Sequence, residues 1–119
     1  MDEISLTLPA DDAFRGVAHL VLGGLAVRLD LTYESLEDIE LALDALLDGR
    51  GDDGDVTVRV RVDGDQLRTM VGPLRPEVLG ELTREAGGGL DVRRILDATC
   101  DSVTVAGDSV EMTKWIGAR

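Results

Sequence analysis

The chain has 119 residues, enough for one compact domain with a hydrophobic core but not for two. Its 24 Asp and Glu residues outnumber 12 Lys and Arg residues and give a formal net charge of −12, which argues against binding to nucleic acids and to anionic membranes. No run approaches the roughly 18 apolar residues that a membrane-spanning helix needs, and residues 1–10 lack the basic start and apolar run of a secretory signal. We therefore expect a single cytoplasmic domain over residues 1–119.

The N-terminal half predicts a strand followed by two helices. Ile4, Leu6 and Leu8 alternate with polar residues, which is typical of a half-buried strand, and Pro9 ends it. A helix of about four turns follows, because apolar residues then recur at helical spacing. Its apolar positions are Phe14, Val17, Ala18, Val21, Leu22, Leu25, Ala26 and Leu29. A second helix begins near Ser35.

The C-terminal half predicts two hairpins separated by helices. Valine occupies every second position from Val56 to Val62, and Asp63-Gly64 turns this strand back into a second one over Leu67–Val71. A short helix over Pro76–Ala86, a glycine run, another helix and a last hairpin complete the chain. The order β-α-α-β-β-α-α-β-β indicates an α+β fold, a two-layer sandwich of one mixed, mostly antiparallel sheet with helices on one face.

The glycine run is the candidate cofactor-binding segment. Gly87, Gly88, Gly89 and Leu90 directly precede a predicted helix. Backbone amides at the start of a helix lie at the positive end of its dipole and can bind a phosphate. Three glycines before a helix are also typical of a plain flexible connection, so the run alone does not establish a nucleotide site.

Other charged or reactive side chains have simple interpretations. Carboxylates on one side of the second helix, interpreted as a solvated face rather than a metal site, are Glu37, Glu40, Asp44 and Asp48. Cys100 is the single cysteine, and we expect it to pack rather than to react. Arg59 and Arg61 project from the polar face of the valine strand, where they are solvated or meet an acidic helix of the same domain.

With these elements assigned, the chain resembles the histidine-kinase-like ATPase (GHKL) fold, in the branch of the small anti-sigma-factor serine kinases. The resemblance covers nearly the whole chain and includes three local blocks. The first block, Leu41–Gly49, looks like the family's N-box helix, commonly written A-L-D-E-L-x-x-N. In that family the Glu polarises the attacking hydroxyl or water, and the Asn holds the magnesium that bridges the ATP phosphates.

The N-box match leaves two registers. In the first, which keeps the A-L-D match, the Glu position falls on Ala45 and the Asn position on Gly49, so the resemblance implies neither a catalytic base nor a metal ligand. A shift by one residue places Asp44 and Asp48 at these positions and loses the A-L-D match. We expect the first register.

Of the other two blocks, one lacks the family's Asp and the other keeps the family's glycines. The family's D-x-G motif follows the hairpin and reads the adenine amino group, but the matching stretch Leu67–Leu74 has no Asp, and Pro73 stands about where it is expected. The third block, Gly87–Leu90 with the helix after it, keeps its glycines. The resemblance thus implies the fold and a partner-binding role, while the substituted positions argue against a bound ATP or magnesium cofactor.

We therefore expect a non-catalytic, anti-sigma-factor-like regulator, a pseudokinase, that docks on a sigma factor or on a STAS-type anti-sigma antagonist; a homodimer is compatible with the sequence. Two alternatives stay open: an ATP-binding serine/threonine kinase, and a sensor of another small anion in the old cleft. In the resembling family the first helix takes part in docking, so Arg15, on the polar side of that helix with His19, is the candidate partner-binding residue. An ordinary surface arginine is the alternative.

Overall fold

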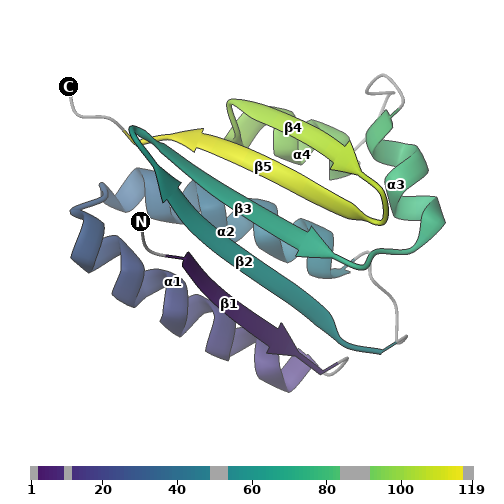
Figure 1. Ribbon diagram of the computed structural model, residues 1–119, viewed down its shortest axis with the longest axis horizontal. Coiled ribbons are helices and arrows are strands. Elements are labelled where there is room, and N and C mark those ends of the chain that lie inside the picture. Colours follow the sequence, from purple (N-terminus) through teal and green to yellow (C-terminus); the bar gives the residue numbers. More distant parts are fainter. Residues whose placement is uncertain (1–2, 10–11, 49–53, 84–91, 117–119) are drawn as a thin grey trace.

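The computed structural model describes residues 3–9, 12–48, 54–83 and 92–116. Its elements are, in chain order, β1 (Glu3–Leu8), α1 (Arg15–Leu29), α2 (Tyr33–Asp48), β2 (Val56–Asp63), β3 (Gln66–Gly72), α3 (Pro76–Thr83), α4 (Val92–Thr99), β4 (Ser102–Ala106) and β5 (Ser109–Trp115). The five strands form one sheet in the order β1-β2-β3-β5-β4, and α1, α2 and α4 lie behind it in the view of Figure 1. The predicted α+β fold with helices on one face of a sheet is confirmed. Within the described ranges no helix is both long and apolar enough to cross a membrane.

The predicted mixed character of the sheet is wrong, because all four pairs of neighbouring strands are antiparallel. The helices α3 and α4 carry the chain from β3 to β4, and these two strands run in the same direction. They would be parallel neighbours if they were adjacent. Instead the chain turns back at Gly107, which has a positive φ of 64°, and β5 lies between them.

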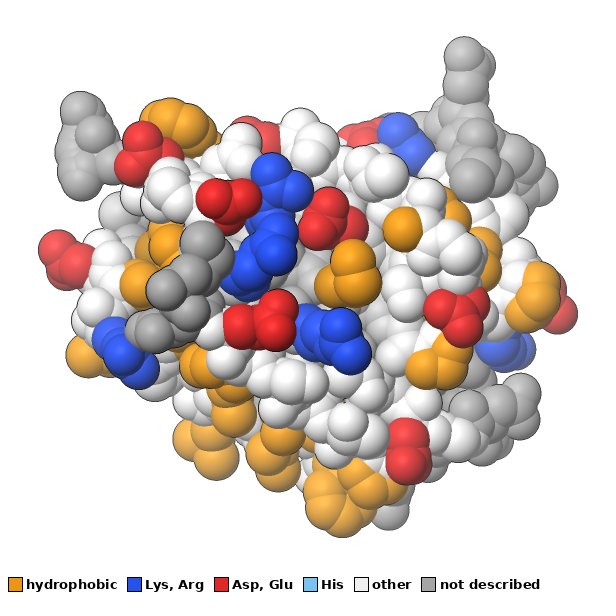
Figure 2. Space-filling view, in the orientation of Figure 1, with side chains coloured by type: hydrophobic (Ala, Val, Ile, Leu, Met, Phe, Trp, Pro, Cys, Tyr) orange, Lys and Arg blue, Asp and Glu red, His pale blue; other side chains and the backbone are white. Residues whose placement is uncertain are grey.

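The core lies between the sheet and the helices. The inward valines of β2, Val56, Val58 and Val60, are buried, as are Leu43 and Leu46 of α2. Because side chains alternate along a strand, the residues between these valines point away from the helices. We call this helix-free side of the sheet the open face; it faces the viewer in Figures 1 and 2.

Helix α1 buries a narrower face than its apolar pattern predicts. The structure buries Ala18, Leu22, Leu25 and Ala26, whereas Phe14, expected in the core, is 42% exposed. The physical reason is position: α1 packs on α2 and β1 at the side of the domain, so only half of its circumference is covered. An exposed apolar strip remains on its outer side, at Val17, Leu20 and Val27.

Candidate functional site

The candidate docking residue lies at the junction of α1 and α2. The Nε2 atom of His19 is 2.9 Å from Oδ1 of Asp44, and the Nε atom of Arg15 is 3.9 Å from the same oxygen. The second ring nitrogen of His19 is 3.8 Å from Oε2 of Glu40. Arg15 and His19 therefore lie on the polar side of α1, where the carboxylates of α2 attract them and cover them in part. Their side chains remain 24% and 36% exposed.

The residues of the two N-box registers point in different directions. Ala45 is buried at 7% exposed, while the side chain of its neighbour Asp44 is 30% exposed and contacts α1. Successive residues of an α-helix are rotated by about 100°, so the side chains of these two positions point in different directions. Gly49 lies outside the described residues, and so does the side chain of Asp48.

The residue that the resemblance places at the adenine-reading position has no polar side chain. Pro73 is exposed and follows Gly72 through a cis peptide bond, and a proline ring has no acceptor for an adenine amino group. The segment from Gly87 to Leu90 lies outside the described residues. Among those that are described, no group of three or more His, Cys, Asp or Glu side chains could hold a metal ion. Ala45 and Pro73, which the resemblance places at the base and adenine positions, have no side-chain group that could act as a base or accept a hydrogen bond from adenine.

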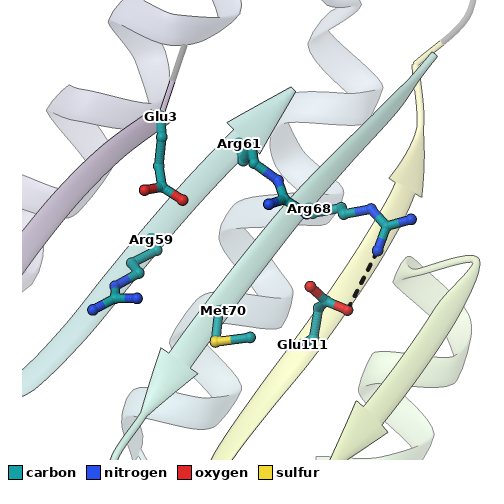
Figure 3. Close-up of a pocket in the computed structure, with 6 residues that line it drawn as sticks. All are labelled: Glu3, Arg59, Arg61, Arg68, Met70 and Glu111. Carbon is teal, nitrogen blue, oxygen red and sulfur yellow. Dashed lines mark ion pairs between the residues drawn. The ribbon is translucent and has the colours of Figure 1, made fainter. Parts of the chain in front are cut away.

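A second cluster lies on the open face and was only partly anticipated. Arg59 and Arg61 of β2 lie beside Arg68 of β3 (Figure 3), and the strand register places Arg61 directly opposite Arg68. We call these three residues the open-face arginine cluster. They do not meet the acidic helix α2, because that helix covers the opposite side of the sheet. The sequence shows that Gln66, Arg68 and Met70 share one face of their strand. Only the hairpin register shows that Arg68 lies next to Arg61 of β2.

The single cysteine has no sign of reactivity. Cys100 is half-buried against the core, and burial raises the pKa of its thiol above the usual value. Since the thiolate is the reactive form, this shift supports the interpretation of Cys100 as a packing residue.

The curated proteins that are similar to this chain carry the same name. No protein-family model matches the chain. The serine-protein kinase RsbW of Bacillus pumilus is 30% identical over 142 residues, covering 98% of this chain and 87% of the relative. The RsbW of Bacillus velezensis is 28% identical over 145 residues, covering 100% and 89%. Because these alignments are longer than the 119 residues of this chain, the relatives contain segments that it lacks.

A solved structure supports the fold. The crystal structure of the RsbU and RsbW domains of Rv1364c from Mycobacterium tuberculosis matches 96% of this chain with a TM-score of 0.62. The sequence identity is 14%, and the match spans 32% of that solved chain. At this identity the match establishes that the architecture is shared, and nothing more.

Proposed function

Since this chain belongs to the family of the serine-protein kinase RsbW, we propose that it is an anti-sigma-factor-like regulator that docks on a sigma factor or on a STAS-type antagonist without transferring phosphate. The observation that carries the proposal is Ala45, an apolar and buried residue at the position of the family's catalytic Glu. Pro73, at the adenine-reading position, supports the same conclusion. The proposal implies a cytoplasmic protein that needs no cofactor; a homodimer stays a prediction.

We expect the purified protein to transfer no labelled phosphate from ATP to a STAS-type antagonist in the presence of magnesium. We also expect no rise in its melting temperature at millimolar ATP, because a ligand that binds the native state stabilises it by mass action. The Bacillus pumilus relative, assayed in parallel, controls for active reagents. Phosphate transfer by this chain would overturn the docking-only proposal.

A kinase is the second candidate, and Asp44 is the observation that favours it. This carboxylate is partly exposed and precedes Ala45 by one residue, so the shifted N-box register would give the chain a base. If phosphate transfer is detected, Asp44→Asn should abolish it, while Glu37→Gln, an exposed carboxylate of the same helix, should not. Melting temperatures of both variants separate lost chemistry from lost contacts with α1.

Arg15 remains our proposed docking residue, because an arginine that is partly exposed can form bidentate pairs with a partner's carboxylates. We expect Arg15→Ala to weaken capture of its sigma factor or antagonist about thirtyfold, which corresponds to the roughly 2 kcal/mol of an interface hot spot. The melting temperature should hardly change, since the Arg15–Asp44 pair is partly exposed and 3.9 Å long. Arg28→Ala, at the exposed end of the same helix, is the matched control. Equal capture by all three proteins would exclude Arg15 from the interface.

A further inference from the structure

Two of the three arginines of the open-face cluster have no ion pair in the described part of the chain. Arg68 pairs with Asp63, at 3.4 Å from Nε to Oδ2, and with Glu111, at 3.6 Å from Nη1 to Oε1. Within residues 3–9, 12–48, 54–83 and 92–116, neither Arg59 nor Arg61 forms an ion pair. Figure 3 marks the ion pair between Arg68 and Glu111.

The cluster brings like charges together within the sheet. Arg61 is directly opposite Arg68 on β3, where like charges destabilise the pair, and directly opposite Glu3 on β1, where opposite charges attract. The Nε atom of Arg61 is also shielded from solvent and has no hydrogen-bond partner among the described residues, which adds a desolvation cost. The chain has 24 Asp and Glu residues, so carboxylates that could pair with Arg59 and Arg61 are not scarce.

The surface around the cluster is hollowed. One shallow pocket of about 190 Å³ is lined by the three arginines together with Glu3, Met70 and Glu111. A second pocket of about 250 Å³ shares Arg59 and Met70 with it and continues to Thr57, Gly72 and Ser109. The two pockets form a groove across β2 and β3, and Figure 2 shows Lys and Arg side chains over the middle of this face with Asp and Glu side chains around them.

We propose that this groove binds an extended acidic segment of another protein. Arg59 and Arg61 lie two residues apart on one face of β2, which separates them by about 7 Å along the strand. An extended segment with carboxylates at every second residue has the same spacing, and each guanidinium can bind a carboxylate through two hydrogen bonds. The proposal goes beyond the proposed function, because it involves neither α1 nor the nucleotide positions.

Charge favours an acidic protein segment over a nucleic acid. Three arginines would neutralise few phosphates, and the net charge of −12 repels a long polyanion. Glu3 and Glu111 flank the cluster, so a continuous phosphate backbone would meet repulsion on both sides. A short segment can place two carboxylates at Arg59 and Arg61 alone and carry uncharged residues where Glu3 and Glu111 lie, so it avoids the repulsion that a continuous polyanion meets within the screening length of about 8 Å.

The test uses a fluorescein-labelled peptide in which Glu and Thr alternate, titrated with the full chain and followed by fluorescence anisotropy. We expect binding that weakens with salt, and at least about tenfold weaker binding by the double variant Arg59→Gln/Arg61→Gln. Arg28→Gln, which removes one positive charge from α1, should bind like the parent protein. The melting temperature of the double variant should stay close to that of the parent, because the variant removes both the like-charge pair with Arg68 and the opposite-charge pair with Glu3; a purely structural role would lower it.

Four results would overturn the proposal. The first is that the parent protein fails to bind the peptide. The second is that the double variant binds the peptide as tightly as the parent does. The third is that a labelled single-stranded DNA binds the parent protein more tightly than the peptide does. The fourth is a parent protein that sediments as a dimer while the double variant is a monomer, which would assign the groove to a second copy of the chain.

Discussion

Replacing Leu43 with alanine should lower the free energy of unfolding by about 2–5 kcal/mol, the range measured for buried leucines in protein cores. Leu43 lies on α2 between the sheet and the other helices and exposes 0% of its surface. Its removal would leave a cavity that the neighbouring helices and strands cannot fully close. Urea unfolding at 25 °C, followed by circular dichroism, measures the change.

Leu41 provides a matched control on the same helix. It lies two residues before Leu43 but is 53% exposed, so Leu41→Ala makes the same chemical change without opening a cavity. We expect an effect within about 0.5 kcal/mol, as for most surface substitutions. Similar losses in both variants would mean that α2 does not bury the face described above.

Gly72→Ala should be the second strongly destabilising substitution, by about 1–3 kcal/mol, the usual effect of overpacking. A Cβ atom added at Gly72 would lie 2.1 Å from Oγ, 2.8 Å from Cβ and 3.0 Å from Cα of Ser109. Since the last of these is a backbone atom, a rotamer change of Ser109 cannot relieve the contact. The start of β5 would have to move away from the end of β3, as thermal unfolding of the variant would reveal.

Two further variants test whether Gly72→Ala destabilises the protein through the contact with Ser109 or simply because a glycine is replaced. Gly24→Ala, at an exposed position of α1 with nothing within 4 Å of the added Cβ, should raise stability by about 0.5–1 kcal/mol through helix propensity. Adding Ser109→Gly to Gly72→Ala should restore part of the lost stability, because it removes two of the three close atoms. A Gly72→Ala protein as stable as the parent would show that the strands have room there.

Local patterns in the sequence were sufficient for the strands and hairpins. The valine alternation from Val56 to Val62 determines both the strand and its buried face, and Asp63-Gly64 provides the turn, where Gly64 has a positive φ of 63°. For α1 the pattern was insufficient, because apolar residues occupy both its buried and its exposed sides. Only the position of α1 beside α2 and β1 decides that Leu25 is buried and Phe14 is not.

The candidate sites depended still more on tertiary arrangement. The sequence identified Ala45 and Arg15 from a linear motif and a helical face, but the contact between His19 and Asp44 joins residues 25 positions apart. The packing of α1 on α2 creates that contact, and no local pattern encodes it. The open-face arginine cluster likewise needs the β2–β3 register, which sets Arg61 opposite Arg68.

The sheet order also bears on how the chain folds during synthesis. The strand β1 is made first, yet in the described sheet its neighbour is β2, with Leu8 opposite Val56. Both helices α1 and α2 must be made before this pair can close, whereas the β2–β3 and β4–β5 hairpins close locally and quickly. Among the described strands, β1 therefore waits longest for its partner with its hydrogen-bonding edge unpaired, and an unpaired edge can associate with other chains before folding is complete.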